Sequence, residues 1–409
     1  MDYSDIYNRF AEDDSVFIPG NSGEPRAFVE ALAAAVHLPK LNITHSFIPG
    51  INTAPLATDE NKLLEIAFFP RTGKYFNSDH VLFKRDSWMG IFHYLQQQRF
   101  DWLVLQLSPP NEDGLCSLGT SVEFLPLLLE RSNNVIGIVN QQVPFVFNAP
   151  RVKFNDLACS IECNEPLVSV SSPNPDEASI KIAQHLSTLI DHDTLLQTGI
   201  GNIPDIFLSS LKHHRDLKFS SGMLSDGFLE LHDAGALASD FDHSCTLCLG
   251  SNDFYQRLPE IENLSLVPVD VSHALPPENC NEVFLAINSA LQVDCDGRAN
   301  LEFLGDRRIS NVGGALDFAR RANRVDQSLN VVAMPATAGN GKYSRIVSQL
   351  LLPEHDSLAG TSVDRVVTEF GIADLTGRTL KQRTEAMIEV AAPQFRSELE
   401  KAFGKTDSS

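Results

Sequence analysis

Short apolar runs, each ending in Gly, Pro, Ser or Asn, recur along the chain and alternate with longer amphipathic segments. Near-continuous apolar runs of this length are typical of strands in a parallel sheet that is covered on both faces. The runs predicted to be buried strands are residues 102–110, 134–140, 167–173, 195–201, 247–251, 283–289, 331–336 and 365–371.

Two segments between these runs, 176–191 and 202–214, have helical spacing, and Asp176 and Asn202 are their expected N-caps. Strands that alternate with helices indicate an α/β fold. A length of 409 residues suggests at least two domains at about 150 residues each. The pattern is broken near SSPNPDEA, so we expect one domain over 1–175 and a second over 176–409.

The charge of the chain restricts its partners. A formal net charge of −21 argues against a nucleic-acid partner, because phosphate backbones need a basic face. It leaves room for a small anionic ligand, since single Lys or Arg residues and local dipoles can override the global field.

The seven cysteines are too few and too scattered for a disulfide framework. Cys245 and Cys248 have CxxC spacing, but they lie in an apolar run without a second pair, which favours small core side chains and no metal site. The first residues, MDYSDIYNRFAEDD, lack the basic and apolar regions of a secretion signal, and no run of about 18 apolar residues occurs. We therefore expect a cytoplasmic protein without membrane contact.

Two glycine turns precede helical segments and can bind a ligand. LLQTGIGNIPD delivers a Gly-x-Gly turn from a predicted strand, and NVGGALDFARRA has a Gly-Gly pair before a helix. Such turns let backbone N–H groups approach a phosphate or carbonyl oxygen, and the helix N-terminus adds partial positive charge. Taken singly, each could also be an ordinary tight strand-to-helix turn.

Taken in order, the motifs are more specific. They are SPPNEDGLCSLG, LQTGIGNIPD, SSGMLSDG, AINSALQVDCDG, NVGGALDFARRA, VVTEFGIADLTGRTLKQR and IEVAAPQFRSEL. Over about residues 15–403 the chain resembles the acetyl-CoA hydrolase/transferase family, and within it the 4-hydroxybutyrate and acetate CoA-transferases. The resemblance implies two related open α/β domains of the class I CoA-transferase type, an active site between them and a homo-oligomer. It also implies acyl-CoA as a substrate rather than a permanently bound cofactor, a small carboxylic acid as a possible second substrate, and a role in acetate metabolism.

The resemblance implies that the family's catalytic glutamate is replaced in this chain. In the family its carboxylate attacks the acyl-CoA carbonyl, and the released CoA thiolate then forms a glutamyl-CoA thioester, which is covalent catalysis by a carboxylate. The matching position is Gly222, which has no side chain to attack with. A glycine here would leave a space of carboxylate size in which a water could stand.

A second departure concerns the oxyanion donors. The family has an asparagine where this chain has His273, whereas the other donor, a backbone N–H, is matched by Gly314. Losing one such donor typically costs about 3–4 kcal/mol of transition-state stabilisation. With a pKa near the unperturbed value of about 6.5, His273 could be a general base for hydrolysis or an acid/base in a lyase reaction; alternatively it is a neutral hydrogen-bond donor.

The resemblance also implies a set of CoA contacts. Gly339 stands where the family has a lysine, with Lys342 close by, and Glu369 matches a position that we expect to be structural. The implied CoA contacts are Gly199, Ile200, Gly201, Asn202, Ile203, Leu291, Gly314 and Gly339.

Three functions remain open at this point. The protein could process a short-chain acyl-CoA without the glutamyl-CoA intermediate, by hydrolysis or lyase-type chemistry, and we favour this function. It could be a conventional CoA-transferase that uses another carboxylate, such as Asp226 or Glu230. It could also be a CoA-binding protein without catalytic activity.

Overall fold

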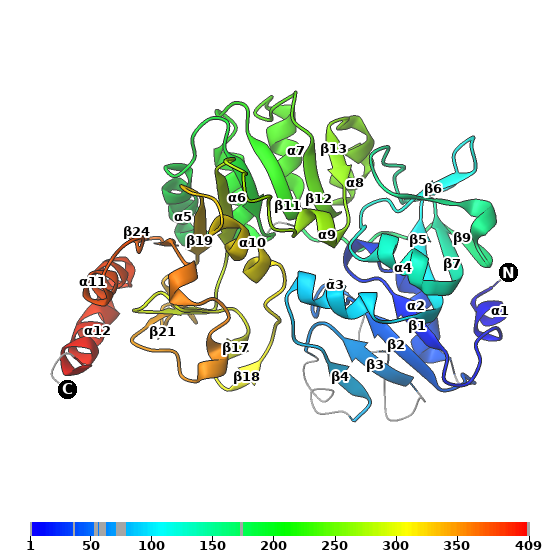
Figure 1. The fold of residues 1–409 in the computed structure, drawn as a ribbon, viewed down its shortest axis with the longest axis horizontal. Coiled ribbons are helices and arrows are strands. Elements are labelled where there is room, and N and C mark those ends of the chain that lie inside the picture. Colours follow the sequence, from blue (N-terminus) through cyan, green and yellow to red (C-terminus); the bar gives the residue numbers. More distant parts are fainter. Residues whose placement is uncertain are drawn as a thin grey trace. The chain divides into compact units, whose positions relative to one another are not determined.

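The computed structural model describes residues 2–35, 37–52, 56, 63–70, 79–171 and 175–406. The chain forms two compact units (Figure 1). Unit 1 comprises Met1–Ser171 and Asp242–Ser272, and unit 2 comprises Ser172–Phe241 and His273–Ser409. Residues 242–272 thus cluster with the N-terminal part of the chain, an arrangement that a single boundary after residue 175 does not describe.

The described part of unit 1 is built on a seven-stranded sheet in the order β4-β3-β2-β1-β5-β7-β9. All of its neighbouring strands pair in parallel. The chain adds strands on one side of β1 and then on the other, so the strand order reverses between β1 and β5. The strands are β1 (Ser15–Ile18), β2 (Leu41–His45), β3 (Leu63–Ala67), β4 (Val81–Phe83), β5 (Phe100–Leu107), β7 (Ser132–Asn140) and β9 (Cys159–Cys163).

Helices and short strands complete unit 1. Apolar side chains of β1, β2, β5 and α2 form one continuous core, which includes Val16, Ile43, Val104 and Phe28. Its described α-helices are α1 (Tyr3–Tyr7), α2 (Arg26–Ala34), α3 (Trp88–Gln96), α4 (Leu125–Arg131), α8 (Asn252–Arg257) and α9 (Val269–Ser272). Its short strands include the antiparallel pair β6 (Leu115–Ser117) and β8 (Arg151–Lys153), and the parallel pair β12 (His243–Cys248) and β13 (Leu264–Leu266).

Unit 1 also buries a carboxyl group. Glu123 is 1% exposed and accepts hydrogen bonds from Asn21 Nδ2 (2.8 Å) and Ser46 Oγ (3.0 Å). Burial raises the pKa of Glu123 to about 7, because desolvation of the carboxylate outweighs these two hydrogen bonds. This carboxyl therefore changes its charge near neutral pH.

Unit 2 contains strands in the order β11-β10-β14-β19-β23-β24. The pairs are parallel except the last, in which β24 returns antiparallel to β23. The order reverses beside β10, whose neighbours are β11 and β14, and ligands of open α/β sheets bind at the carboxyl ends of strands near such a reversal. The strands are β10 (Leu195–Thr198), β11 (Lys218–Leu224), β14 (Phe284–Asn288), β19 (Leu329–Ala333), β23 (Arg365–Thr368) and β24 (Gly371–Asp374).

The helices of unit 2 follow the strands in the alternation that the sequence predicts. α5 packs on α6 and α6 on α7, whereas α10 packs on β14 and β19 (Figure 1). Asp176 caps α5 by accepting a hydrogen bond from the N–H of Ser179 (2.7 Å). The helices are α5 (Glu177–Ser187), α6 (Asn202–Ser210), α7 (Asp226–Asp233), α10 (Ala315–Ala322), α11 (Leu380–Val390) and α12 (Pro393–Thr406).

Short strands of unit 2 connect these larger elements. β15 (Gln292–Asp294) pairs with β16 (Ala299–Asn300) and β22 (Ile346–Val347). Two further hairpins are β17 (Phe303–Leu304) with β18 (Arg307–Arg308) and β20 (Thr337–Ala338) with β21 (Tyr343–Ser344). Among the described residues, no helix is long and apolar enough to cross a membrane.

The predicted strands are confirmed for six runs, which become β5, β7, β10, β14, β19 and β23. The run 247–251 is strand only at its first two residues, since β12 ends at Cys248. The prediction for 167–173 is wrong over 167–171, and residues 172–173 lie outside the described residues. There the backbone bonds to a side chain and a loop instead of a strand: Val168 O accepts from the Tyr255 hydroxyl (2.8 Å), and Val170 N–H donates to Gly250 O (3.1 Å).

Candidate active site

A strand face and a helix face meet around Gly222. Ser220 and Gly222 lie two apart on β11 and therefore project from the same side of the sheet. Gly314, Phe318 and Arg321 are spaced by four and three residues at the start and along α10, so they share one face of that helix. Contacts between these two faces define the candidate active site.

The imidazole of His273 fills the space above both glycines. An ideal Cβ placed on Gly222 would lie 3.1 Å from Cε1 and 3.1 Å from Nε2 of His273, and 3.2 Å from Cε2 of Phe318. A Cβ on Gly314 would lie only 2.5 Å from His273 Nε2. The structure thus brings together the three residues predicted to be catalytic. The expected space for a water at Gly222 is instead taken by the imidazole and a phenyl ring.

The environment of His273 favours the uncharged ring. His273 is 2% exposed, and its ring packs on Phe318 with centroids 4.5 Å apart. Burial, and after it the positive charge of Arg321, lower the pKa of His273 to about 3. The condition for an acid/base role of His273, a pKa near 6.5, is therefore not met, and the alternative of a neutral hydrogen-bond donor remains. At neutral pH the ring is a weak base but still carries one N–H that can donate a hydrogen bond.

Gly314 retains the geometry of a backbone donor. It is the N-cap of α10, with φ −78°, and its carbonyl accepts from the N–H of Phe318 (3.0 Å). The first N–H groups of a helix have no partner within the helix, so they are available to a carbonyl oxygen. Nothing among the described residues accepts a hydrogen bond from the N–H of Gly314.

The first glycine turn lies at the carboxyl end of β10, next to the reversal of strand order. Gly201 has φ +111°, a conformation that favours glycine, and it caps α6. Asn202 is therefore the first residue of the helix rather than its N-cap, and its Nδ2 donates to Ser179 Oγ (3.1 Å). A Cβ on Gly199 or Gly201 would meet no atom within 4 Å. Open space over a glycine turn lets a ligand approach the backbone closely.

Two of the predicted CoA contacts lie elsewhere in unit 2. Leu291 directly precedes β15, and Gly339 (φ +61°) forms the turn between β20 and β21. Beside them is a pocket of about 350 Å³, whose lining includes Gln292, Lys342, Tyr343 and, from α12, Phe395 and Glu398. The prediction that Leu291 and Gly339 contact CoA stays a prediction.

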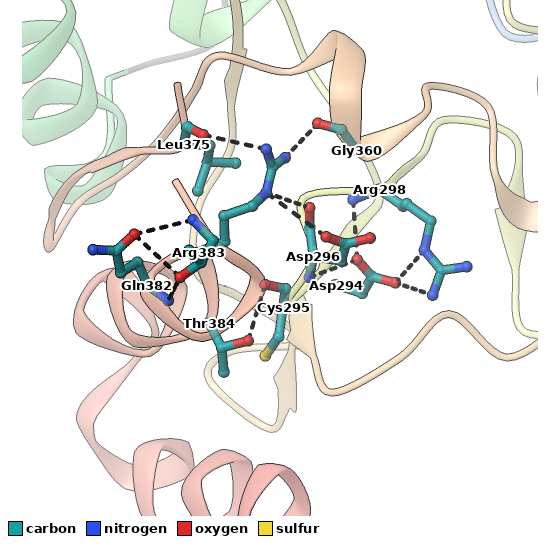
Figure 2. Close-up of polar contacts among 10 residues, drawn as sticks. Asp294, Cys295, Asp296, Arg298, Gly360, Leu375, Gln382, Arg383 and Thr384 are labelled. Atoms are coloured by element: carbon teal, nitrogen blue, oxygen red, sulfur yellow. Dashed lines mark hydrogen bonds and ion pairs between the residues drawn. The ribbon is translucent and has the colours of Figure 1, made fainter. Parts of the chain in front are cut away.

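A polar cluster holds the hairpin that follows Leu291 (Figure 2). The buried carboxylate of Asp294 accepts from Arg298 Nε (2.9 Å) and from the N–H groups of Asp296 (3.1 Å) and Arg298 (3.0 Å). Arg383 on α11 donates to the carbonyls of Asp296 (2.9 Å), Leu375 (3.2 Å) and Gly360. Asp294, Arg298 and Arg383 thus bind one another's side chains or nearby backbone groups. Their role in this cluster is structural.

Other residues singled out in the sequence also have structural partners. Glu369 Oε2 accepts from the N–H of Ala336 (2.7 Å). Glu230 pairs with Lys212 (2.9 Å) and accepts from the hydroxyl of Ser209, which places its carboxylate in another contact network than that of His273. Cys245 and Cys248 are buried in β12 with their sulfurs 3.8 Å apart.

Sequence reasoning missed three residues around the site. Phe318 contacts His273 directly, Arg321 lies one helical turn further along α10, and Ser220 Oγ accepts from Arg321 Nη1 (2.8 Å). The spacing of 314, 318 and 321 could have placed these residues on one helix face. The partner of that face could not be read from spacing, because it is a strand almost a hundred residues earlier.

Comparison with known proteins places this chain in a family. The acetyl-CoA hydrolase/transferase N-terminal domain matches residues 1–150, and the C-terminal domain of the same family matches residues 250–403. A 4-hydroxybutyrate coenzyme A transferase from Clostridium kluyveri is 34% identical over 314 residues, which cover 75% of this chain and 72% of that protein. A succinyl-CoA:cyclohexane-1-carboxylate CoA transferase from Geobacter metallireducens is 29% identical over an alignment that covers 95% of this chain and 91% of that protein.

Solved structures agree on the fold. The 4-hydroxybutyrate CoA-transferase from Porphyromonas gingivalis superposes with a TM-score of 0.80 at 26% identity, covering 99% of this chain and 96% of that one. RipA from Yersinia pestis superposes with a TM-score of 0.87 over the whole of both chains at 22% identity, a likeness of fold alone. The chain belongs to the acetyl-CoA hydrolase/transferase family, whose members act on acyl-CoA.

Proposed function

We propose that this protein binds a short-chain acyl-CoA and acts on its thioester without a glutamyl-CoA intermediate, by hydrolysis or lyase-type chemistry. The observation that carries the proposal is the imidazole of His273 packed against Gly222 and Gly314. Position 222 offers no carboxylate, and the groups nearest to its backbone are a neutral imidazole and a phenyl ring. A nucleophilic carboxylate at this position is therefore not part of the chemistry that we propose.

The remaining groups suit polarisation of a carbonyl. A neutral imidazole N–H and the backbone N–H of Gly314 are two donors on neighbouring elements, and donors fixed before the reaction stabilise the charge that develops on a thioester oxygen. A histidine kept neutral is well suited to this role, because it donates a hydrogen bond without giving up its proton. We assign His273 this electrophilic role in place of the general-base role.

In the hydrolytic form of the reaction, a water oxygen bonds to the thioester carbonyl carbon and the carbon–sulfur bond breaks. The CoA sulfur leaves as the thiolate and takes up the proton that the water releases. The chain's own contribution is to bind CoA, with contacts from Gly199 to Ile203 and around Leu291 and Gly339, and to polarise the carbonyl. A homo-oligomeric state, a cytoplasmic location and a role in acetate metabolism are parts of the same proposal, whereas a small carboxylic acid as second substrate belongs to the transferase alternative.

One observation favours a second candidate function. A histidine with a pKa of about 3 cannot accept a proton efficiently at neutral pH, so His273 is not an efficient general base. This supports a CoA-binding protein without catalytic activity. For the third candidate, a transferase that uses another carboxylate, Glu230 is already paired with Lys212 and Ser209. Asp226, the first residue of α7, stays a candidate for that role.

A panel of acyl-CoAs, incubated with and without acetate and followed for free thiol and for acyl exchange, separates the candidates. Thiol release that does not depend on acetate is the result expected for hydrolysis. Acetate-dependent exchange would instead establish a transferase. Saturable CoA binding with neither thiol release nor exchange would establish the non-catalytic function.

A further inference from the structure

Arg321 is a largely buried cation in the candidate site. Its Nη1 donates to Ser220 Oγ (2.8 Å), and its Cζ lies 4.3 Å from the centroid of the Phe284 ring. Among the described residues, no carboxylate lies within 4.0 Å of its guanidinium. Burial lowers the pKa of Arg321 from its ordinary value, but an arginine remains charged at any physiological pH.

A series of packed rings, tilted relative to one another, connects this cation to His273. The centroids of Phe284 and Phe318 are 6.3 Å apart, and that of Phe318 is 4.5 Å from the imidazole of His273. The guanidinium of Arg321 packs on the Phe284 ring, and the imidazole of His273 packs on the Phe318 ring. The position of Arg321 therefore bears on the position of His273 through direct packing.

We infer that Arg321 is a positioning residue for His273: it anchors the packed rings that hold the imidazole over Gly222 and Gly314, and it places a largely buried cation beside them. The inference rests on the proposed function, in which His273 acts as a neutral donor. A cation near an imidazole disfavours the imidazolium, because bringing two positive charges together in a buried site is costly.

The charges that face this group come from several elements. Arg321 is the charged residue of α10 that acts on His273. On the same face of β11 as Ser220 and Gly222 lies the charged Lys218, which pairs with Asp193 (2.6 Å) and Glu282 (3.9 Å). Cys280 and Glu282, from the segment before β14, act electrostatically on Arg321 and partly offset its charge. The positive charge of Arg321 therefore remains the main electrostatic influence on the imidazole.

The residue directly before Arg321 offers a matched control. Arg320 also lies on α10, but its side chain is 58% exposed and pairs with Asp317 at 3.7 Å. It has the same charge and nearly the same place in the sequence, without the contacts to Ser220 and Phe284. An effect that is specific to Arg321 will be absent when Arg320 is changed.

The test is an NMR titration of histidine side chains in the full-length apo protein, with the His273 signals assigned by their loss in His273→Asn. We expect these signals to begin their acid shift at a higher pH in Arg321→Met and Arg321→Gln than in wild type. Arg321→Lys, which restores the charge, and Arg320→Met should follow wild type. Arg321→Gln can keep the hydrogen bond to Ser220, so it carries the test if Arg321→Met does not fold.

Two results would overturn the inference: identical titration of His273 in wild type and in the folded variants without the charge, or an equal shift in Arg320→Met. The titration needs no CoA. Failure of the proposed function would instead be seen as absence of CoA binding or of thioester chemistry, so the two failures can be told apart.

Discussion

The Nε2 atom of His273 lies 2.5 Å from the place that a Cβ on Gly314 would occupy. The two residues are therefore fitted to each other: the imidazole can occupy this position only while residue 314 has no side chain. At Gly222 the corresponding distance is 3.1 Å, so that contact is tight but less restrictive.

Replacing each glycine by alanine should destabilise unit 2 to different extents. Gly314→Ala should cost about 1–3 kcal/mol, the usual range for overpacking, and Gly222→Ala should cost less. Neither glycine has a positive φ, so the cost is steric. The measurement is urea unfolding monitored by a probe in unit 2. Combining Gly314→Ala with His273→Asn should recover part of the loss; a full loss in the double variant would show that His273 is not the clashing group.

The buried carboxyl of Glu123 predicts a pH dependence in unit 1. Its folded-state pKa of about 7 lies above the ordinary value of 4.5, so the folded state holds the proton more tightly. The contribution of Glu123 to the free energy of unfolding is fully present below about pH 4.5. It is lost as the pH rises through 7, by an amount on the order of 3 kcal/mol. Glu123→Gln should remove this loss.

Thermal or urea unfolding of unit 1 at pH 5 and pH 8 checks this prediction. The neutral amide can still accept from Asn21 and donate to Ser46 Oγ, so its packing is matched. Glu123→Gln should gain stability over wild type on going from pH 5 to pH 8, whereas the exposed Glu162→Gln should follow wild type. Parallel pH profiles for wild type and Glu123→Gln would show that Glu123 does not titrate in this range.

Binding of CoA should depend on the open space over Gly199. A Cβ there meets no protein atom, so Gly199→Val should fold normally while its side chain blocks close approach of a ligand to the turn. Calorimetry with CoA at low salt should show binding below millimolar concentration for wild type and at least tenfold weaker binding for the variant. Unchanged thermal unfolding is the control. Equal CoA affinity in both proteins would remove this turn from the CoA site.

If Gly222 and His273 match the family's glutamate and asparagine, as we propose, transfer should be restored only when both positions are changed. Gly222→Glu alone should recover little activity, because the new side chain meets the imidazole of His273 at once. Gly222→Glu with His273→Asn frees that space and supplies both the nucleophile and the family's donor, so the effects should be non-additive. The measurement is acetate-dependent exchange from propionyl-CoA in wild type, both single variants and the double variant. A double variant at the wild-type background would show that more than these two positions differ from a transferase.

The fold could largely be predicted from the sequence, because parallel strands are near-continuous apolar runs and each glycine turn marks a strand end. The segment 167–171 escaped this reasoning: Leu167 and Val168 are buried, but the backbone bonds to Tyr255 and Gly250 rather than to a strand. Residues 242–272 carry ordinary strand and helix signals, and nothing local shows that they cluster with the N-terminal part of the chain.

Three positions of the candidate site could be predicted from the sequence, but the charge state of its histidine could not. The motifs placed Gly222, His273 and Gly314 together, and the structure does so too. The charge state of His273 was not readable from the sequence, because it depends on burial by Phe318 and on a cation, Arg321, that reaches the site only through the packing of α10 on the sheet.

The central claim is that this protein handles acyl-CoA without a glutamyl-CoA thioester, and intact-protein mass spectrometry after incubation with acetyl-CoA tests it most directly. Gly222→Glu with His273→Asn provides the comparison, since it supplies the side chain that can carry the adduct. We expect the wild-type mass to stay unchanged under conditions that add covalent CoA to the double variant. A covalent CoA adduct on a carboxylate of the wild-type protein would contradict the claim and establish a transferase with a different nucleophile.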